Sequence, residues 1–399
     1  MSEFELQHAV YQMLQDQTFA RNIKNINYFK GRRKGSRPGV REYSIKNIMT
    51  DRYDDAVLWV YERLLSRDVY QVGGPNPRNI ALGKKDRLFP DIIIYDDERN
   101  FIIFELKVGK KTEREAVTEL FAYVFELRTV MPSLNNSEIS LVVVSEEFGT
   151  LLSHAVLQLI SYFGLRVMCL KPIFQRELTF NVEDPLKRLG LDDFALSEDS
   201  FTTFSLCLNQ TERVSPSANV SFDRVSKIAE DMLLDRANRL SSNGFYFINK
   251  YYDSGDEVGA ISTYFITIAL VDPFKLLDIE KLTASSSELS DIVLEMAREG
   301  ESHLQNHYWE LVKEAQTFLG RFYSVSYEGC MSYSQYLRSV NRHMNVNTIA
   351  CNVWGEFGEF VREVIYSDKS GFDILNEEID HANPLCLWEA LGKMFGNEQ

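Results

Sequence analysis

Two carboxylates and an ammonium group lie in a stretch of otherwise apolar residues, "FPDIIIYDDERNFIIFELKVGKK" (residues 89–111). Asp91 begins one apolar run, and Glu105 and Lys107 end the next. The polar segment "DDERN" between the runs predicts an antiparallel hairpin. If the hairpin is symmetric about Glu98, Asp91 lies directly opposite Glu105, with the two Cβ atoms about 5 Å apart.

The residue types in this hairpin indicate a chemistry. Side chains alternate along a strand, so Glu105 and Lys107 share one face. Two neighbouring carboxylates repel each other unless a cation lies between them. Oxygen ligands suit Mg²⁺ (or Mn²⁺), and Mg²⁺ keeps several of its waters when it binds. Lys107 beside such an ion would position or deprotonate the attacking water and stabilise phosphate charge. We therefore expect metal-assisted phosphodiester hydrolysis.

The elements around the hairpin favour an α/β fold. Residues 139–144, "ISLVVV", and residues 165–170 have the composition of buried strands. Helical patterns occupy residues 1–20, 51–67, 112–129 and 151–163, and the last of these ends at Gly164, a typical position for a C-terminal glycine. The order β-β-α-β-α-β, with apolar strands, predicts an α/β sandwich built on a mixed sheet.

Pro90-Asp91 and Glu105-Leu106-Lys107, at this spacing, resemble the two halves of the PD-(D/E)XK motif. The chain is thus similar, over about residues 50–172, to the nuclease superfamily of that name, which has the restriction-endonuclease-like fold. The resemblance implies a metal set of Asp91, Glu105 and Leu106. It also implies that Asp91, Glu105 and Lys107 are catalytic.

The resemblance extends to the flanking helices. In that family the helix before the hairpin often supplies an acid, which here is Glu62 in "YERLL" and is expected to support catalysis. The helix after the lysine commonly carries a pattern that contains glutamine. In "ELFAY", Leu120 and Tyr123 match that pattern, but Glu119 stands at the glutamine position. This departure weakens any role carried over to Glu119.

A basic segment precedes these elements. Residues 21–41 contain eight Lys or Arg and no acid, in a chain whose net charge is −15. Its glycines and proline predict a loop, and its charge predicts contact with nucleic-acid phosphates. The alternative is a solvated flexible loop. The candidate nucleic-acid-binding residues are Lys30, Arg32, Arg33, Lys34, Arg37 and Arg41.

The length of 399 residues suggests two domains. We expect a nuclease-like domain with the basic loop over residues 1–175. Residues 176–220, rich in Ser, Thr and Asn, predict a connector with one short strand at 201–208. Residues 221–399 predict a mainly helical domain for regulation or assembly, which also contains a hairpin of residues 245–252 and 260–270.

Two weaker patterns lie in the C-terminal half. His303 and His307 have the i, i+4 spacing of a metal pair but lack the glutamate of HExxH, so a solvated pair is favoured. Arg338 and His343 have the Arg-x4-His spacing and resemble HEPN ribonucleases, although the residue after the arginine is Ser339. That spacing often arises by chance.

Composition narrows the cellular context. The five cysteines are scattered and form no CxxC, which argues against a disulfide framework or a zinc ribbon. The N-terminal residues do not predict a signal peptide, and the sequence contains no apolar stretch of about 20 residues. The expected location is the cytoplasm.

The leading hypothesis is a metal-dependent endonuclease, with DNA as its expected substrate. Its two-part organisation resembles that of prokaryotic anti-phage defence effectors. Nucleases of this fold often pair their active sites, which favours a homodimer, and the C-terminal domain could also bind a partner protein. Two alternatives remain open: a nuclease-like module that binds nucleic acid or protein without cleaving, and a HEPN-type ribonuclease in the C-terminal half.

Overall fold

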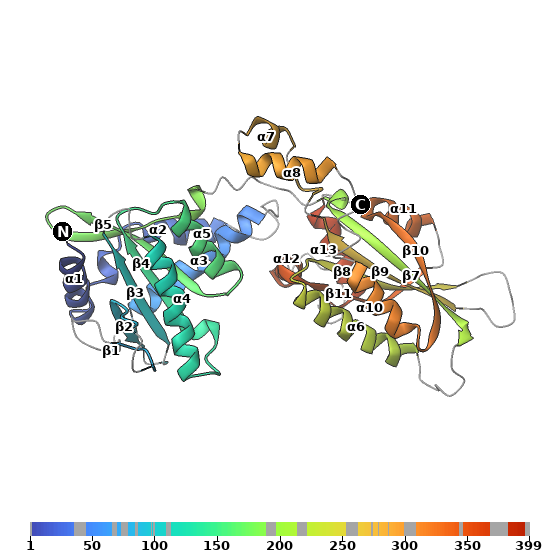
Figure 1. Ribbon diagram of the computed structural model, residues 1–399, viewed down its shortest axis with the longest axis horizontal. Coiled ribbons are helices and arrows are strands. Elements are labelled where there is room, and N and C mark those ends of the chain that lie inside the picture. Colours follow the sequence, from blue (N-terminus) through green and yellow to red (C-terminus); the bar gives the residue numbers. More distant parts are fainter. Residues whose placement is uncertain are drawn as a thin grey trace. The chain divides into compact units, whose positions relative to one another are not determined.

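The computed structural model divides the chain into two compact units, Met1–Phe194 (unit 1) and Ala195–Gln399 (unit 2). Each unit has its own sheet (Figure 1). The described residues are 2–35, 45–65, 70–72, 79–83, 87–96, 98, 100–108, 113–188, 197–213, 222–252, 262–272, 274–277, 279–285, 287–298, 309–342, 346–367 and 382–395.

Unit 1 contains a mixed sheet whose strands follow one another in chain order, from β1 to β6. The strands are β1 (Tyr70–Val72), β2 (Ile92–Tyr95), β3 (Phe101–Lys107), β4 (Ile139–Ser145), β5 (Arg166–Phe174) and β6 (Leu178–Val182). Strands β3, β4 and β5 are parallel neighbours, and the other pairs are antiparallel. The predicted α/β fold with a mixed sheet is thus confirmed.

Helices cover both faces of this sheet. They are α1 (Glu3–Gln15), α2 (Ile26–Gly35), α3 (Ile45–Leu64), α4 (Glu113–Val130) and α5 (Thr150–Ser161), with short 3₁₀ turns η1 (Ala20–Asn22), η3 (Asn136–Glu138) and η4 (Pro185–Arg188). Gly164, just beyond α5, has φ +59°, as the sequence pattern predicted.

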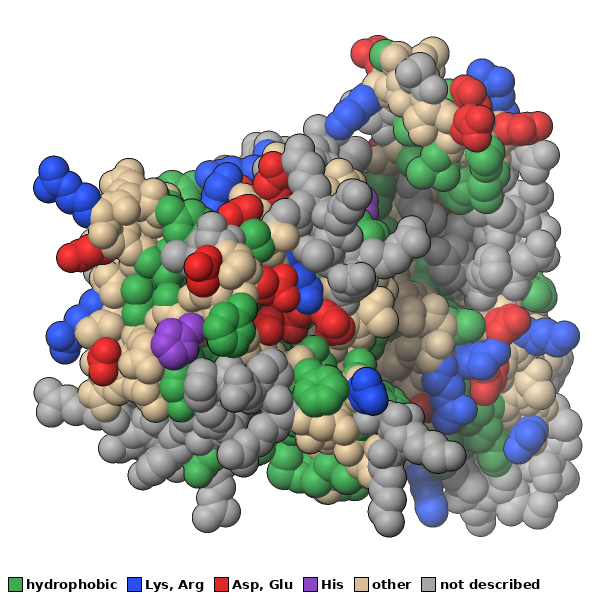
Figure 2. Space-filling view, turned by 60° about the vertical axis from the view of Figure 1, so that its left-hand side comes forward, with side chains coloured by type: hydrophobic (Ala, Val, Ile, Leu, Met, Phe, Trp, Pro, Cys, Tyr) green, Lys and Arg blue, Asp and Glu red, His purple; other side chains and the backbone are tan. Residues whose placement is uncertain are grey.

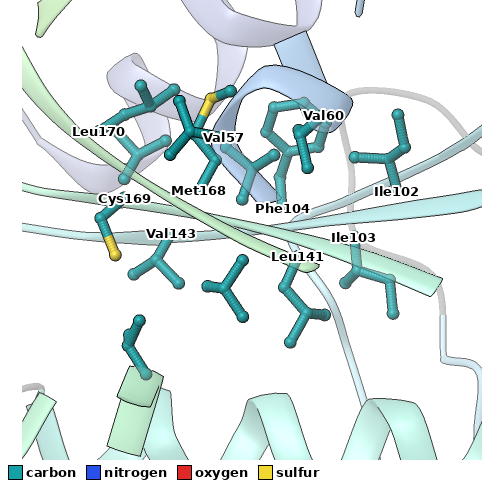
Figure 3. Close-up of a cluster of buried hydrophobic side chains, with 14 of the residues drawn as sticks. Val57, Val60, Ile102, Ile103, Phe104, Leu141, Val143, Met168, Cys169 and Leu170 are labelled. Atoms are coloured by element: carbon teal, nitrogen blue, oxygen red, sulfur yellow. The ribbon is translucent and has the colours of Figure 1, made fainter. Parts of the chain in front are cut away.

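The two faces of β3 have different neighbours. Figure 3 shows Val57 and Val60 of α3 together with Phe104 on one side of the strands, whereas Ile103 points to the other side. Because side chains alternate, Glu105 and Lys107 share the face of Ile103. Helix α3 therefore packs on the face opposite to these two charged residues.

Unit 2 is built on an antiparallel sheet with the strand order β10-β7-β9-β8-β11. Its strands are β7 (Phe201–Arg213), β8 (Gly244–Tyr252), β9 (Ser262–Val271), β10 (Tyr323–Ser332) and β11 (Val346–Trp354). The expected hairpin corresponds to β8 and β9, which pair antiparallel. The prediction of a mainly helical C-terminal half is wrong, because this sheet forms the centre of the unit.

Helices flank this second sheet. They are α6 (Phe222–Arg239), α10 (Trp309–Leu319), α11 (Tyr333–Arg342), α12 (Gly355–Ser367) and α13 (Pro384–Met394). Two further helices, α7 (Ile279–Ala284) and α8 (Glu288–Arg298), pack against each other, and the 3₁₀ turn η5 covers Glu198–Ser200. Helices α6 and α10 contribute Val225, Leu233 and Leu311 to a core shared with the sheet. An aromatic cluster that includes Phe201, Phe245 and Tyr333 forms a second packed region.

The stretch predicted as a connector, residues 176–220, contains β6 of the first sheet and β7 of the second. Its polar residues are not all solvated: Ser205 Oγ lies 3.2 Å from Thr267 Oγ1 of β9, and both side chains are buried. In the described part of the chain, no helix is long and apolar enough to cross a bilayer.

Candidate active site

The β2–β3 hairpin has the predicted register. Ile92 pairs with Phe104 and Tyr95 with Phe101, so the pairing is centred on Glu98. Continued by one residue, this register places Asp91 opposite Glu105. A hydrogen bond of 2.7 Å from the backbone N–H of Leu106 to Asp91 Oδ2 confirms that Asp91 lies against this end of β3.

The Asp91 segment is held by three elements. Besides Leu106 of β3, Gln7 of α1 donates its Nε2 hydrogen to the backbone carbonyl of Asp91 at 2.8 Å. The hydroxyl of Tyr123, on α4, donates to the carbonyl of Phe89 at 3.0 Å. These bonds fix the backbone on both sides of Pro90, which itself lacks an N–H group.

Lys107 lies between two carboxylates. Its Nζ is 2.5 Å from Glu105 Oε1 and 2.8 Å from Glu119 Oε2 of α4. The side chains of Glu105 and Lys107 are only 2% and 9% exposed, whereas that of Glu119 is 39% exposed. Glu119 therefore marks the solvent side of the cluster.

Burial shifts the pKa values of the carboxyl groups. The pKa of Glu105 is raised to about 9, mainly by burial. The charge of Asp91 and a hydrogen bond with Glu119 raise it further. Burial also raises the pKa of Asp91 to about 6, although the Leu106 N–H and the charge of Lys107 oppose this. Burial alone would lower the pKa of Lys107, but Glu105 and Glu119 raise it above its ordinary value. Burial thus favours the protonated form of Glu105, whereas a bound cation would favour its ionised form.

These residues fit a divalent cation. Among the described residues, Glu105 Oε2 is buried and has no hydrogen-bond partner. A buried carboxylate oxygen without a donor is unfavourable, and a cation would satisfy it. No group of three or more His, Cys, Asp or Glu in the described part of the chain could hold a metal ion. Asp91 and Glu105 would thus hold the ion as a pair, which suits Mg²⁺ because it needs few protein ligands.

Comparison of the chain with protein-family models, curated proteins and solved structures finds no match. The inference about this site therefore depends on its own geometry.

Leu106 can contribute only through its backbone. Its side chain is fully buried on the face opposite to Glu105 and Lys107, and its N–H holds Asp91. The predicted metal set of Asp91, Glu105 and Leu106 thus lies at one end of the hairpin.

Glu62 is not brought to this cluster. It is an exposed residue near the C-terminal end of α3, the helix that packs on the opposite face of the sheet. Its neighbour Arg63 binds Asp96 and Glu98, at 3.5 and 2.6 Å, at the turn of the hairpin. Because a strand rises about 3.3 Å per residue, the turn lies roughly 15 Å or more from Asp91. The prediction of a supporting role for Glu62 is not supported by this position.

The contribution of α1 to the site was not apparent from the sequence. The negative charge of Glu3 contributes to the raised pKa of Asp91, and Gln7, one turn later, holds the Asp91 backbone. The family pattern places a supporting acid on the helix before the hairpin, and two helical patterns precede it. Their sequence positions alone do not say which of the two adjoins Asp91. In Figure 2, acidic side chains gather on the near face of this unit beside exposed hydrophobic ones.

Over its described residues, 21–35, the basic segment is not the loop that its glycines predicted. Helix α2 covers Ile26–Gly35, and Ile26 and Phe29, one turn apart, are buried in the core. Arg32 Nε donates to Asp54 at 2.7 Å and Arg32 Nη1 donates to Asp184 at 2.7 Å. Both aspartates are buried, so Arg32 is engaged inside the unit rather than free for phosphate.

The other basic candidates divide into two groups. Lys30 is exposed and lies over the ring of Tyr61, with its Nζ 5.2 Å from the ring centroid. Arg33 and Lys34 lie on α2, but their side chains are outside the described residues, as are Arg37 and Arg41 entirely.

The weaker C-terminal patterns are also incompletely described. Arg338 is an exposed residue of α11, and His343 lies outside the described residues. His303 and His307 lie outside them too.

Proposed function

We propose that unit 1 is a metal-dependent nuclease domain of the PD-(D/E)XK type, with a restriction-endonuclease-like fold, that hydrolyses phosphodiester bonds. The observation that supports this most directly is the pairing of Asp91 with Glu105, whose buried Oε2 has no partner among the described residues. A buried carboxylate oxygen without a hydrogen-bond partner does not stabilise the hairpin, so a purely structural role does not explain it.

Each residue of the cluster has a role in this proposal. Asp91 and Glu105 would hold Mg²⁺ or Mn²⁺, and the backbone N–H of Leu106 orients Asp91. When bound, the ion would polarise the scissile phosphate and stabilise the charge that develops on it. Lys107, next to Glu105, orients the attacking water and donates hydrogen bonds to a phosphate oxygen.

The wider functional context is proposed by analogy. DNA is the expected substrate, and the expected setting is a cytoplasmic anti-phage defence effector that acts as a homodimer. Unit 2, which has its own sheet and core, is proposed to serve regulation, assembly or partner binding. The basic residues that remain candidates for phosphate contact are Lys30, Arg33, Lys34, Arg37 and Arg41, with Arg32 now assigned to the interior.

The test is incubation of the protein with plasmid, linear DNA and RNA in the presence of Mg²⁺, Mn²⁺ or EDTA. We expect cleavage that requires the divalent ion and that is lost in Asp91→Ala, Glu105→Ala and Lys107→Ala. Glu98→Gln is the matched control, because Glu98 is a glutamate of the same hairpin whose side chain is 64% exposed at the turn. It should cleave like the wild type.

The alternatives give different results in the same assay. Binding of nucleic acid without cleavage in either ion would identify a non-cleaving module. Cleavage of RNA that persists in EDTA and in Lys107→Ala would support the alternative of a metal-independent ribonuclease in unit 2. Circular dichroism spectra of the variants should match the wild type, which separates lost chemistry from lost folding.

A further inference from the structure

We infer that Glu119 is a positioning residue, which keeps Lys107 in place when Glu105 binds a cation. The inference rests on the proposed function, and it concerns a residue to which the sequence resemblance assigns no role. It starts from the position of Lys107 Nζ, which lies 2.5 Å from Glu105 Oε1 and 2.8 Å from Glu119 Oε2. The ammonium group is thus shared between a strand residue and a helix residue.

The two partners of Lys107 differ in what else they can bind. Glu105 is almost fully buried, its Oε2 has no hydrogen-bond partner among the described residues, and the hairpin register pairs it with Asp91, so it is the partner that a cation would recruit. Glu119 approaches Lys107 from α4, with its side chain 39% exposed. The two glutamates are thus suited to separate tasks, one for the ion and one for the lysine.

A cation between Asp91 and Glu105 changes the forces on Lys107. The ion neutralises the charge of Glu105 that attracts the ammonium group, and it repels that group directly. Lysine has a flexible stem, so without another anion its head would move away from the reacting atoms. Glu119 is the second carboxylate already in contact, and it can hold Lys107 without displacing the ion.

Two rival roles for Glu119 lead to different experimental results. Glu119 could itself bind the ion, or its contact with Lys107 could be an ordinary surface ion pair of little consequence. In the first case the ion needs Glu119 whether or not Lys107 is present. In the second case neither ion binding nor catalysis depends on Glu119.

Calorimetric titration of the full chain with Mg²⁺ separates these cases. The proteins compared are the wild type, Glu119→Gln, Lys107→Met and the double variant. In Glu119→Gln, Lys107 is left with Glu105 alone and competes with the ion, so we expect Mg²⁺ affinity to fall about 10-fold, in the range of outer-shell partners. In the Lys107→Met background, Glu119→Gln should also lower Mg²⁺ affinity, but by a factor at least about three times smaller than in the wild type. The two effects are not additive because Glu119 acts through Lys107.

The kinetic test uses the matched control Glu126→Gln. Glu126 lies two turns further along α4 and accepts a hydrogen bond from the backbone N–H of Leu82, at 2.5 Å. Glu119→Gln should lower kcat about 10- to 100-fold with KM unchanged, because a displaced lysine affects the transition state rather than substrate binding. Glu119→Asp, which keeps the charge, should recover part of kcat, and Glu126→Gln should behave as the wild type.

The outcomes distinguish this inference from the proposed function. An affinity loss that is equally large without Lys107 would make Glu119 an ion ligand and overturn the inference. Unchanged affinity and kcat in Glu119→Gln would overturn it as well. If the wild type binds Mg²⁺ and shows the predicted coupling but cleaves no nucleic acid, the nuclease proposal fails while the role of Glu119 stands. A wild type that binds no divalent ion would overturn both.

Discussion

At the scale of single residues, Glu105 determines the character of the site. It is nearly inaccessible to solvent, its Oε1 pairs with Lys107, and its Oε2 has no hydrogen-bond partner among the described residues. Its carboxyl group is therefore poised between binding a proton and binding a cation. The same burial that makes it a good ion ligand makes its charge costly in the absence of an ion.

This cost predicts a pH dependence of stability. The pKa of Glu105 is about 9 in the folded protein, against an ordinary value of 4.5, so between these pH values the folded protein holds a proton that the unfolded chain has released. Raising the pH therefore favours unfolding, and the stability of the protein in EDTA should fall across this interval. Asp91, with a pKa of about 6, contributes in the same direction at the acidic end.

The dependence can be measured by denaturant unfolding at a series of pH values in EDTA. Glu105→Gln should remove most of the decline, and saturating Mg²⁺ should reduce it in the wild type. Glu98→Gln should keep it. A wild-type stability that rises with pH between these limits would show that Glu105 is ionised in the folded protein.

Arg32 leads to a prediction about stability rather than binding. Its guanidinium pairs with Asp54 and Asp184, which are both buried, and these hydrogen bonds raise its pKa above the ordinary value against the effect of burial. Arg32→Met would leave two buried carboxylates without their cation. The free energy of unfolding should fall by about 3–5 kcal/mol, the cost of breaking a buried ion pair from one side.

Lys30→Met is the control for Arg32, since Lys30 is an exposed residue of the same helix. It should change the free energy of unfolding by less than about 0.5 kcal/mol. If Arg32→Met instead left stability intact and weakened nucleic-acid binding, Arg32 would be returned to the phosphate-binding candidates.

At the scale of elements, the N-terminal half could largely be predicted from sequence, because its strands are apolar and its helices are periodic. "FIIFELK" and "ISLVVVS" are buried along most of their length, and the turn between β2 and β3 could be located from its polar residues. The pairing of Asp91 with Glu105 followed from the centre of that turn. The sequence did not show which helix adjoins Asp91, because the position of a helix in the sequence does not determine which face of the sheet it covers.

In unit 2 the hairpin of β8 and β9 was predicted, but β10 and β11 were not, and β11 shows that a strand can depend on polar contacts with a distant segment. Asn249, in β8, is fully buried, and its Oδ1 accepts a hydrogen bond of 2.7 Å from Thr348 of β11. Its Nδ2 donates to the hydroxyl of Tyr336 at 2.5 Å. A polar residue that is satisfied only by a partner about 90 positions away in the chain resembles a loop residue when the sequence is examined alone.

The junction between β11 and α12 supports another prediction. Gly355, the first residue of α12, has φ +70°, and a Cβ placed there would collide with the backbone carbonyl of Ser242. Gly355→Ala should lower the free energy of unfolding by at least about 1–2 kcal/mol, the cost of the left-handed conformation alone. Thermal unfolding would measure this.

Gly31→Ala is the matched substitution at a glycine without such constraints. Gly31 lies within α2, and a Cβ at this position would meet no heavy atom within 4 Å. The replacement should stabilise the protein by about 0.5–1 kcal/mol. Equal effects of the two substitutions would show that the backbone at Gly355 is not restrained as described.

At the scale of the whole molecule, the chain consists of two units of nearly equal length that share no sheet. Each unit has its own buried apolar cluster, one formed around β3 and β4 and the other around β7 and β9. All the residues of the candidate site belong to unit 1. The chemistry proposed for that unit therefore needs no side chain from unit 2.

We expect the fragment of residues 1–194 to fold on its own and to bind Mg²⁺ with the affinity of the full chain. Its unfolding in denaturant should be cooperative and should match, in midpoint and m-value, one of two transitions of the full chain, because m scales with the surface exposed on unfolding. A fragment with native-like circular dichroism but no Mg²⁺ binding would mean that unit 2 completes the site.

Because the β2–β3 pairing is centred on Glu98, the chain distance between the two motif halves is a by-product of turn length. One residue added on each side of the turn would leave Asp91 facing Glu105. A single residue added within the turn would also leave this pairing unchanged, because hairpin loops of both odd and even length are common. Among diverging sequences, the gap between the motif halves should thus vary with the length of the turn, and a search pattern that allows a variable gap would retain relatives that a fixed gap would reject.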